Sequence, residues 1–232
     1  VLSMKKDHQD AILHFLMAMI GGFLGGYAIF ARMNIFGSAQ TANLIELIKN
    51  IFGANYVESL MRIGALLIYI LAIMIATVLT YKSQWNLKHL VLYLEMICIV
   101  ILGFIPEDIP PIIALYPCFF VTAFQWCIFK GAMGYTSSTI FSTNNIKQTV
   151  VSLTEYFLIQ DTTIKQEKLK KGCFFGGTLL CFHCGVALSY LLWSIFSLTA
   201  IWFLMIPVSI NLGYLIYIEK YAYPIQHIEK MI

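Results

Sequence analysis

Charged side chains are scarce in this chain of 232 residues: only 12% are charged, whereas 59% are hydrophobic. A soluble domain usually carries charge on roughly a quarter of its residues. This shortage excludes a disordered protein and a typical soluble enzyme, and the net charge of +3 is too small to indicate a nucleic-acid partner. Lipid is the solvent that fits this composition, so we expect a multi-pass membrane protein whose main partner is the bilayer.

The chain also lacks the residue patterns of an enzyme or a metal protein. It has no paired catalytic carboxylates, no His–Glu metal constellation and no Gly-x-Ser-x-Gly turn. Its six cysteines fall within or beside apolar runs, which predicts packed thiols rather than disulfides. The spacing of Cys181 and Cys184 is that of a redox or metal motif, but no second ligand pair accompanies it. We therefore expect no catalytic residues, no metal and no cofactor.

Long runs without formal charge predict the membrane spans, because a helix needs about 20 residues to cross roughly 30 Å of hydrocarbon. The run from Gly172 to Ile218 is too long for one helix and is expected to fold back at residues 194–197. One further span is apolar apart from Glu95. The sequence thus predicts an all-α integral membrane protein with six transmembrane helices, at about 11–31, 61–81, 90–106, 109–129, 172–194 and 197–218.

Basic residues predict the orientation of these spans. With a cytoplasmic N-terminus, nearly all lysines fall on the cytoplasmic side, and only Arg32, Lys49 and Arg62 fall on the other. Short cytoplasmic connections carry the excess of lysine and arginine in membrane proteins. We therefore expect both termini in the cytoplasm.

Two long connections, 32–60 and 130–171, contain a matching pattern: Thr-x-Asn, an aliphatic residue, any residue, then Glu or Gln. Asparagine is a strong N-cap residue, and Glu or Gln three positions later can bond back to the cap. The apolar residues that follow fall on one helical face. We expect a short helix capped by Asn43 at about 43–52, and another capped by Asn145 at about 145–159.

Three spans in each half place the two halves in the membrane with opposite orientations. This predicts a 3+3 inverted-topology repeat of residues 1–108 and 109–232. If both short helices dip into the bilayer, their partly positive N-terminal ends form a polar site at mid-depth that accepts an anion or a dipolar solute. The alternative is two amphipathic helices on the membrane surface. The candidate solute-binding residues are Gln40, Thr41, Asn43, Gln125, Thr143, Asn144 and Asn145.

Short motifs in both halves are similar to a known family. Gly21–Tyr27, followed by Phe36–Leu44, resembles the opening of the YoaK-type bacterial membrane proteins, the DUF1275 family, and residues 124–126 and 142–145 are similar to its second block. The chain departs from the family where Gly25 replaces a common Asp and where Ala42 and Asn144 replace glycines. The resemblance implies a six-span protein of the bacterial inner membrane, without an assigned substrate.

Other residues have two interpretations. Glu95 is a candidate coupling group or a structural charge, with Arg62 as its expected partner. The GxxxG spacings at Gly21, Gly22 and Gly172 allow close helix packing, either within the chain or in a homodimer. The leading functional hypothesis is a small-solute permease or secondary transporter. The alternatives are a passive channel using the same pore and a non-transporting scaffold or lipid-binding protein.

Overall fold

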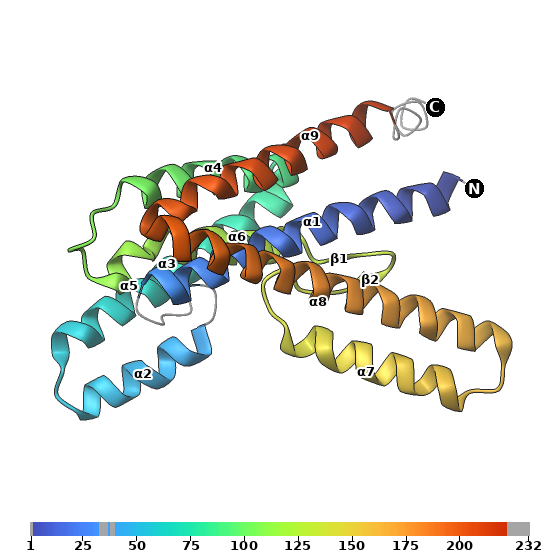
Figure 1. The fold of residues 1–232 in the computed structure, drawn as a ribbon, viewed down its shortest axis with the longest axis horizontal. Coiled ribbons are helices and arrows are strands. Elements are labelled where there is room, and N and C mark those ends of the chain that lie inside the picture. Colours follow the sequence, from blue (N-terminus) through green and yellow to red (C-terminus); the bar gives the residue numbers. More distant parts are fainter. Residues whose placement is uncertain (1, 33–36, 38–39, 222–232) are drawn as a thin grey trace.

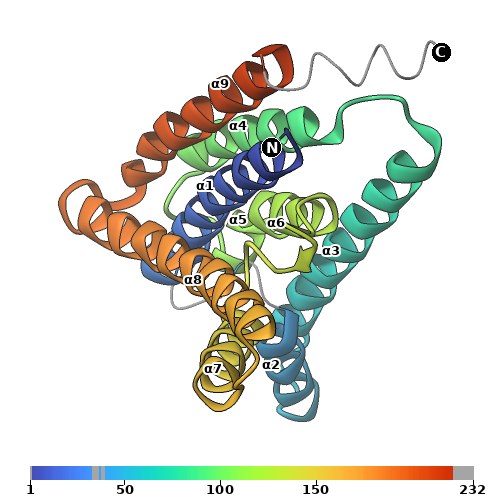
Figure 2. The same ribbon diagram turned by 90° about the vertical axis from the view of Figure 1, so that its right-hand side faces the viewer.

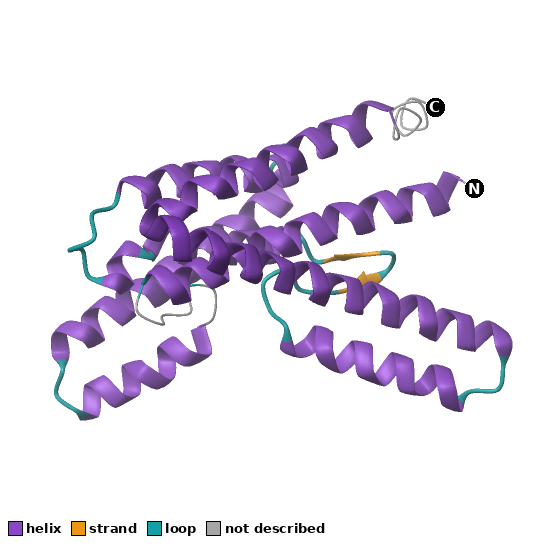
Figure 3. Cartoon of the chain, viewed as in Figure 1, coloured by secondary structure: helices purple, strands orange, loops and turns teal. Residues whose placement is uncertain are grey.

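The structure, a computed structural model, describes residues 2–32, 37 and 40–221. It is 84% helical, and Figure 3 shows that the described part is built almost entirely of helices. This helical content confirms the all-α class. Phe36, Ser38 and Ala39 of the first motif lie outside the described residues.

The helices of the first half are α1 (Leu2–Ala31), α2 (Gln40–Phe52), α3 (Tyr56–Lys82) and α4 (Leu87–Phe104). Those of the second half are α5 (Pro111–Ala114), α6 (Tyr116–Ile128), α7 (Thr143–Leu158), α8 (Thr162–Phe196), the 3-10 helix η1 (Ser197–Leu204) and α9 (Met205–Tyr221). A small hairpin of β1 (Gly131–Ala132) and β2 (Tyr135–Thr136) separates α6 from α7. The sequence had given no indication of this hairpin.

Within the described part, four stretches are long and apolar enough to cross a membrane: Lys6–Ala31, Tyr56–Lys82, Leu87–Phe104 and Thr162–Tyr221. The first three correspond to expected spans. The last one contains α8, η1 and α9 and reverses direction after α8 (Figure 1). The turn begins at Ser197, whose φ of 53° is unusual for a residue other than glycine. This is the fold-back expected at residues 194–197.

The span expected at 109–129 is not one continuous helix. Leu115 ends α5 and precedes α6, which is apolar but only 13 residues long. Pro117 in the first turn of α6 has no N–H group to continue the hydrogen bonds of α5. The break therefore follows from the proline, and α6 alone is shorter than the four candidate spans.

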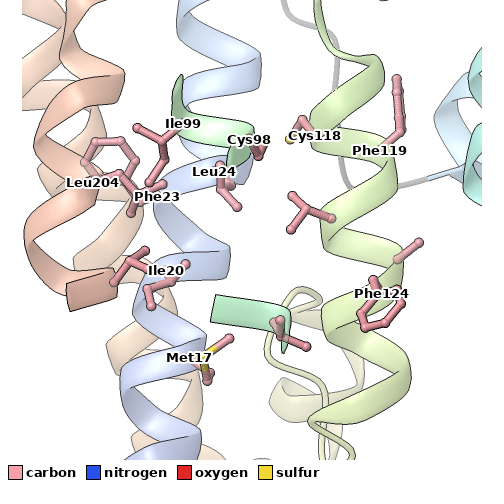
Figure 4. Packing of buried hydrophobic residues seen from close by; sticks show 14 of the residues in the cluster. Met17, Ile20, Phe23, Leu24, Cys98, Ile99, Cys118, Phe119, Phe124 and Leu204 are labelled. Atoms are coloured by element: carbon pink, nitrogen blue, oxygen red, sulfur yellow. The ribbon is translucent and has the colours of Figure 1, made fainter. Parts of the chain in front are cut away.

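Helix α1 is the centre of the bundle, between α8 on one side and α4 and α6 on the other (Figure 2). Its apolar window is 72% buried, against 22%, 33% and 28% for the other candidate spans. Met17, Ile20, Phe23 and Leu24 of α1 are among the buried core residues in Figure 4. The outer helices instead expose large apolar side chains, as expected of helices that face lipid.

Glycine lets α1 and α8 approach at the level of their backbones. A Cβ added to Gly22 of α1 would overlap the Phe182 carbonyl of α8, and one added to Gly185 would overlap the Met19 carbonyl. Gly21 lies against the Thr139 carbonyl in the same way. These glycines of the first GxxxG motif thus pack within the chain.

We predict that Gly22→Ala lowers the free energy of unfolding by about 1–3 kcal/mol, because the helices must separate to admit the methyl group. Gly213→Ala is the matched control, since a Cβ there meets nothing within 4 Å. The control should be neutral or stabilising by up to about 1 kcal/mol, the helix-propensity gain. Unfolding in mixed micelles, followed by circular dichroism, measures both. Equal stability of the two variants would contradict the close contact.

Candidate functional site

Helices α2 and α7 lie along the lower side of the bundle in Figures 1 and 2; they begin close together near the middle of its long axis and run away from each other (Figure 1). A cavity of about 880 Å³ lies between their first turns. Its described lining comes from four helices and from the segment before α7: Gln40, Thr41, Tyr69, Trp126, Phe141, Ser142, Thr143, Asn144 and Lys147. The structure thus brings both halves of the chain to one cavity.

The first turn of α7 has backbone N–H groups with no acceptor inside the helix, and it lies at this cavity. Ser142 stands at its N-cap without a side-chain hydrogen bond to the first turn. In contrast, Asn55, Asn86 and Asp161 accept hydrogen bonds from the first turns of α3, α4 and α8. The first turns of α2 and α7 also contain no acidic residue. Their partial positive charge is therefore not neutralised by a carboxylate of the same turn.

Lys147 adds a full positive charge to the same wall. Among the described residues that line the cavity, it alone carries a formal charge. The aromatic part of the lining consists of Tyr69, Trp126 and Phe141. The rings of Trp126 and Phe141 meet edge to face, with their centroids 5.2 Å apart. The cavity therefore combines cationic and N–H groups with an aromatic wall, an arrangement suited to a small anion with an apolar body.

Asn43 does not cap α2, contrary to the expectation, because the helix begins three residues earlier. Its Oδ1 accepts a hydrogen bond from Arg62 Nη1 at 3.1 Å, and its Nδ2 donates to Gln40 Oε1 at 3.0 Å and the Arg62 carbonyl at 3.4 Å. Arg62 Nη2 pairs with Glu58 Oε1 at 2.9 Å. Asn43 is thus buried between α2 and α3, where it fixes the start of α2 against its neighbour.

Asn145 does not cap α7 either, because it is the third residue of that helix. Its Oδ1 accepts from Ser137 Oγ at 3.0 Å, and its Nδ2 donates to the carbonyls of Ser138 at 2.8 Å and Phe141 at 3.1 Å. The side chain is buried, with 1% exposure. It therefore shapes the segment that leads into α7 rather than facing the cavity.

Gln125 is also behind the cavity wall. Its Nε2 donates to the Met17 carbonyl at 3.0 Å and to Thr139 Oγ1 at 2.9 Å, which joins α6 to α1 and to the segment before α7. Of the seven candidate residues, Gln40, Thr41, Thr143 and Asn144 line the cavity, whereas Asn43, Gln125 and Asn145 support it. Glu95 lies elsewhere, in α4, and the expected partner Arg62 bonds to Glu58 and Asn43 instead.

The cavity lining also contains five residues that are not among the seven candidates: Tyr69, Trp126, Phe141, Ser142 and Lys147. Lys147 and Ser142 could have been found because they flank Thr143 and Asn144 within one helical turn. Tyr69 comes from a helix whose sequence carries no local signal for the cavity. Only the packing of α3 beside α2 brings it there.

Comparison with known proteins supplies the family. The model of a family described as "Protein of unknown function (DUF1275)" matches residues 13–213. The chain belongs to the DUF1275 family. No curated protein and no solved structure matches this DUF1275 member. The resemblance seen in the sequence motifs is thereby confirmed, and the family description supplies no activity.

Asn144 lines the cavity, whereas its neighbour Asn145 supports the wall, so the two residues form a matched pair for mutagenesis. We predict that Asn145→Ala lowers the free energy of unfolding by about 1–3 kcal/mol, since it leaves buried polar groups unpaired. Asn144→Ala should leave it nearly unchanged, because Asn144 is exposed in the cavity. Denaturation in mixed micelles gives both values. A larger loss for Asn144→Ala would show that the roles of the two residues are reversed.

Proposed function

We propose that this DUF1275 protein crosses the membrane six times as a 3+3 inverted repeat. In Figure 1, α1, α4 and α8 run toward one end of the bundle, while α3, α6 and α9 run toward the other. Counting α5 with α6, and η1 with α9, gives six crossings. Helices α2 and α7 are then the matching short helices, and each is followed by a long helix that packs along it.

The helix contacts support this symmetry. Exchanging the halves maps α1 onto α6, α3 onto α8 and α4 onto α9. The contact between α1 and α8 then corresponds to that between α6 and α3, and the contact of α4 with α6 corresponds to that of α9 with α1. All four contacts are present, and α4 packs on α9, its own counterpart. An inverted repeat accounts for this pairing, because each contact has an equivalent in the other half.

The orientation follows from the positions of the basic residues. The start of α1, the end of α9 and the connection between α7 and α8 lie at the same end of the bundle (Figure 1). The lysines at 165–171 follow that connection, whereas Lys49 lies near the connection from α2 to α3 at the other end. By the positive-inside rule, this distribution supports a cytoplasmic location for the N-terminus and for the end of α9, in a protein of the inner membrane.

We infer that the protein is a permease for small organic anions. The observation that carries this proposal is the shared cavity, in which the starts of α2 and α7 meet Lys147 beside an aromatic wall. Tyr69 lies at the middle of the 27-residue helix α3, which supports a position of the cavity near mid-depth. Non-helical backbone at that depth requires burial in protein or a water-filled cavity. A mid-membrane cavity between repeats is the usual position of a transporter's substrate site.

Benzenesulfonate is a suitable binding probe, because its sulfonate remains ionised and its ring matches the aromatic wall. We predict saturable quenching of Trp126 fluorescence by this anion and a much weaker effect of the neutral isostere benzenesulfonamide. Lys147→Gln should weaken anion binding by about tenfold or more, the effect of losing one charge-assisted contact worth about 1.5–3 kcal/mol. Loss of the quenching in the Trp126→Phe variant would identify Trp126 as the quenched residue. Equal affinity for the anion and the amide would contradict an anion site.

Transport is tested in proteoliposomes loaded with unlabelled benzenesulfonate and diluted into the radiolabelled anion. A permease predicts saturable exchange that Lys147→Gln reduces, with Lys170→Gln as the control. Lys170 is a matched lysine because it lies outside the cavity lining. Unitary currents in a planar bilayer would favour the passive channel instead. Binding without flux would favour a non-transporting scaffold.

A further inference from the structure

Glu95 is a buried acid for which the cavity provides no role. It lies in the middle of α4 with 0% exposure, and neither carboxyl oxygen has a hydrogen-bond partner. Among the described acidic residues, it alone is fully buried. A carboxyl group inside a span is costly and usually belongs to a site rather than to the packing.

Contacts at both ends of α4 fix the level of Glu95 in the bundle. His89 pairs with Glu219 of α9 at 2.9 Å, and the Phe104 ring meets Trp202 of η1 with centroids 5.3 Å apart. Because α4 and α9 are antiparallel (Figure 1), Glu95 lies at the level of Asn211. On the side of α1, Lys88 pairs with Asp10 at 3.4 Å, and Arg32 donates to the Ile105 carbonyl at 3.3 Å. These contacts place Glu95 at the level of Met17 to Gly22.

Two further hydrogen-bond acceptors, the amide oxygens of Asn211 and Gln125, lie at this level around Met17. Asn211 Nδ2 contacts Met17 Sδ at 2.8 Å, and Gln125 Nε2 donates to the Met17 carbonyl at 3.0 Å. Both side chains are fully buried, and their amide oxygens have no donor. The layer around Met17 therefore holds carboxyl and amide oxygens without donors. A proton on Glu95 would turn one of its carboxyl oxygens into a donor in this layer of unpaired acceptors.

The charged groups of the neighbouring helices have other partners. Asp10 and Lys88 pair with each other, as do His89 and Glu219, and Arg32 bonds to the carbonyls at the end of α4. The other titratable groups of these helices include His14 and Tyr27 on α1, Tyr93 and Cys98 on α4, Tyr116, Cys118 and Cys127 on α6, and Tyr214 and Tyr217 on α9; further ones stand near the ends of α1 and α9. His14 is 1% exposed, without a partner at either ring nitrogen, between the Asp10–Lys88 pair and the Met17 layer. None of these groups neutralises a Glu95 carboxylate through an ion pair.

We propose that Glu95 carries a proton across the membrane together with the anion bound between α2 and α7. This inference rests on the proposed function and makes the permease an anion–proton symporter. Glu95 takes up the proton from one side and, once the conformation opens to the other side, releases it there to water. The carboxyl group is neutral while buried, so the closed bundle contains no isolated charge at this level.

The test uses proteoliposomes that contain the pH dye pyranine, with the membrane potential clamped to zero by potassium and valinomycin. An inward gradient of benzenesulfonate should acidify the interior of wild-type vesicles. Glu95→Gln, which mimics the neutral acid, should abolish the acidification. It should still exchange internal for external labelled benzenesulfonate, since exchange needs no net proton movement. Glu107→Gln, in the exposed connection after α4, is the matched control and should behave as wild type.

The outcomes separate the two proposals. Three outcomes would each overturn the role of Glu95 and leave the permease intact: exchange by wild type without acidification, sodium-driven uptake, or unchanged acidification by Glu95→Gln. Absence of any benzenesulfonate flux in wild type would refute the permease itself. If Glu95→Gln does not fold, infrared spectra of wild type decide: a protonated-carboxyl C=O band should persist at neutral pH and respond to benzenesulfonate. Absence of that band would contradict the proposal.

Discussion

Hydrocarbon offers no hydrogen-bond partners, and this constraint governs the arrangement around the starts of α2 and α7. A helix begins with four amide groups that have no acceptor within the helix. Such a start is stable inside the bundle only if polar atoms or water meet it. Both starts face one cavity, and the residues behind them, Asn43 and Asn145, are committed to holding the backbone in place. In the proposed membrane placement, the cavity is therefore a consequence of bringing two helix starts together.

The rest of the bundle is built to hold this arrangement. The close contact at Gly22 and Gly185 fixes α8 against α1, and α7 packs along α8 through Gly172 and Gly176. On the other side, Tyr116 Oη donates to the Met61 carbonyl at 2.8 Å and holds α6 against α3, beside which α2 lies. Each short helix is thus positioned by a long helix of its own half, which in turn packs on the first helix of the other half.

Much of the fold follows from the sequence because spans and turns leave local signals. Charge-free runs located α1 and α3, and an apolar run interrupted only by Glu95 located α4. The fold-back near Ser197 was expected from length alone. The Thr-x-Asn pattern identified both short helices and four residues of the cavity. The predicted N-cap roles of Asn43 and Asn145 were wrong, because a buried arginine and a folded segment compete with the helix amides for these side chains. Tyr69 and Trp126 could not be predicted, since only packing between distant helices places them in one wall.

A physical path joins the cavity to the layer around Glu95. Thr139, in the segment that leads into α7, bonds to Gln125, which bonds to Met17, which in turn contacts Asn211. Gly21 of α1 lies against the Thr139 carbonyl, so this segment and α1 cannot shift independently. An anion that draws the start of α7 toward the cavity would also displace Gln125 and Met17. The same displacement changes the surroundings of a carboxyl whose protonation depends on its burial. In the proposed cycle, the anion and the proton are therefore coupled through Gln125 and Met17 rather than through direct contact.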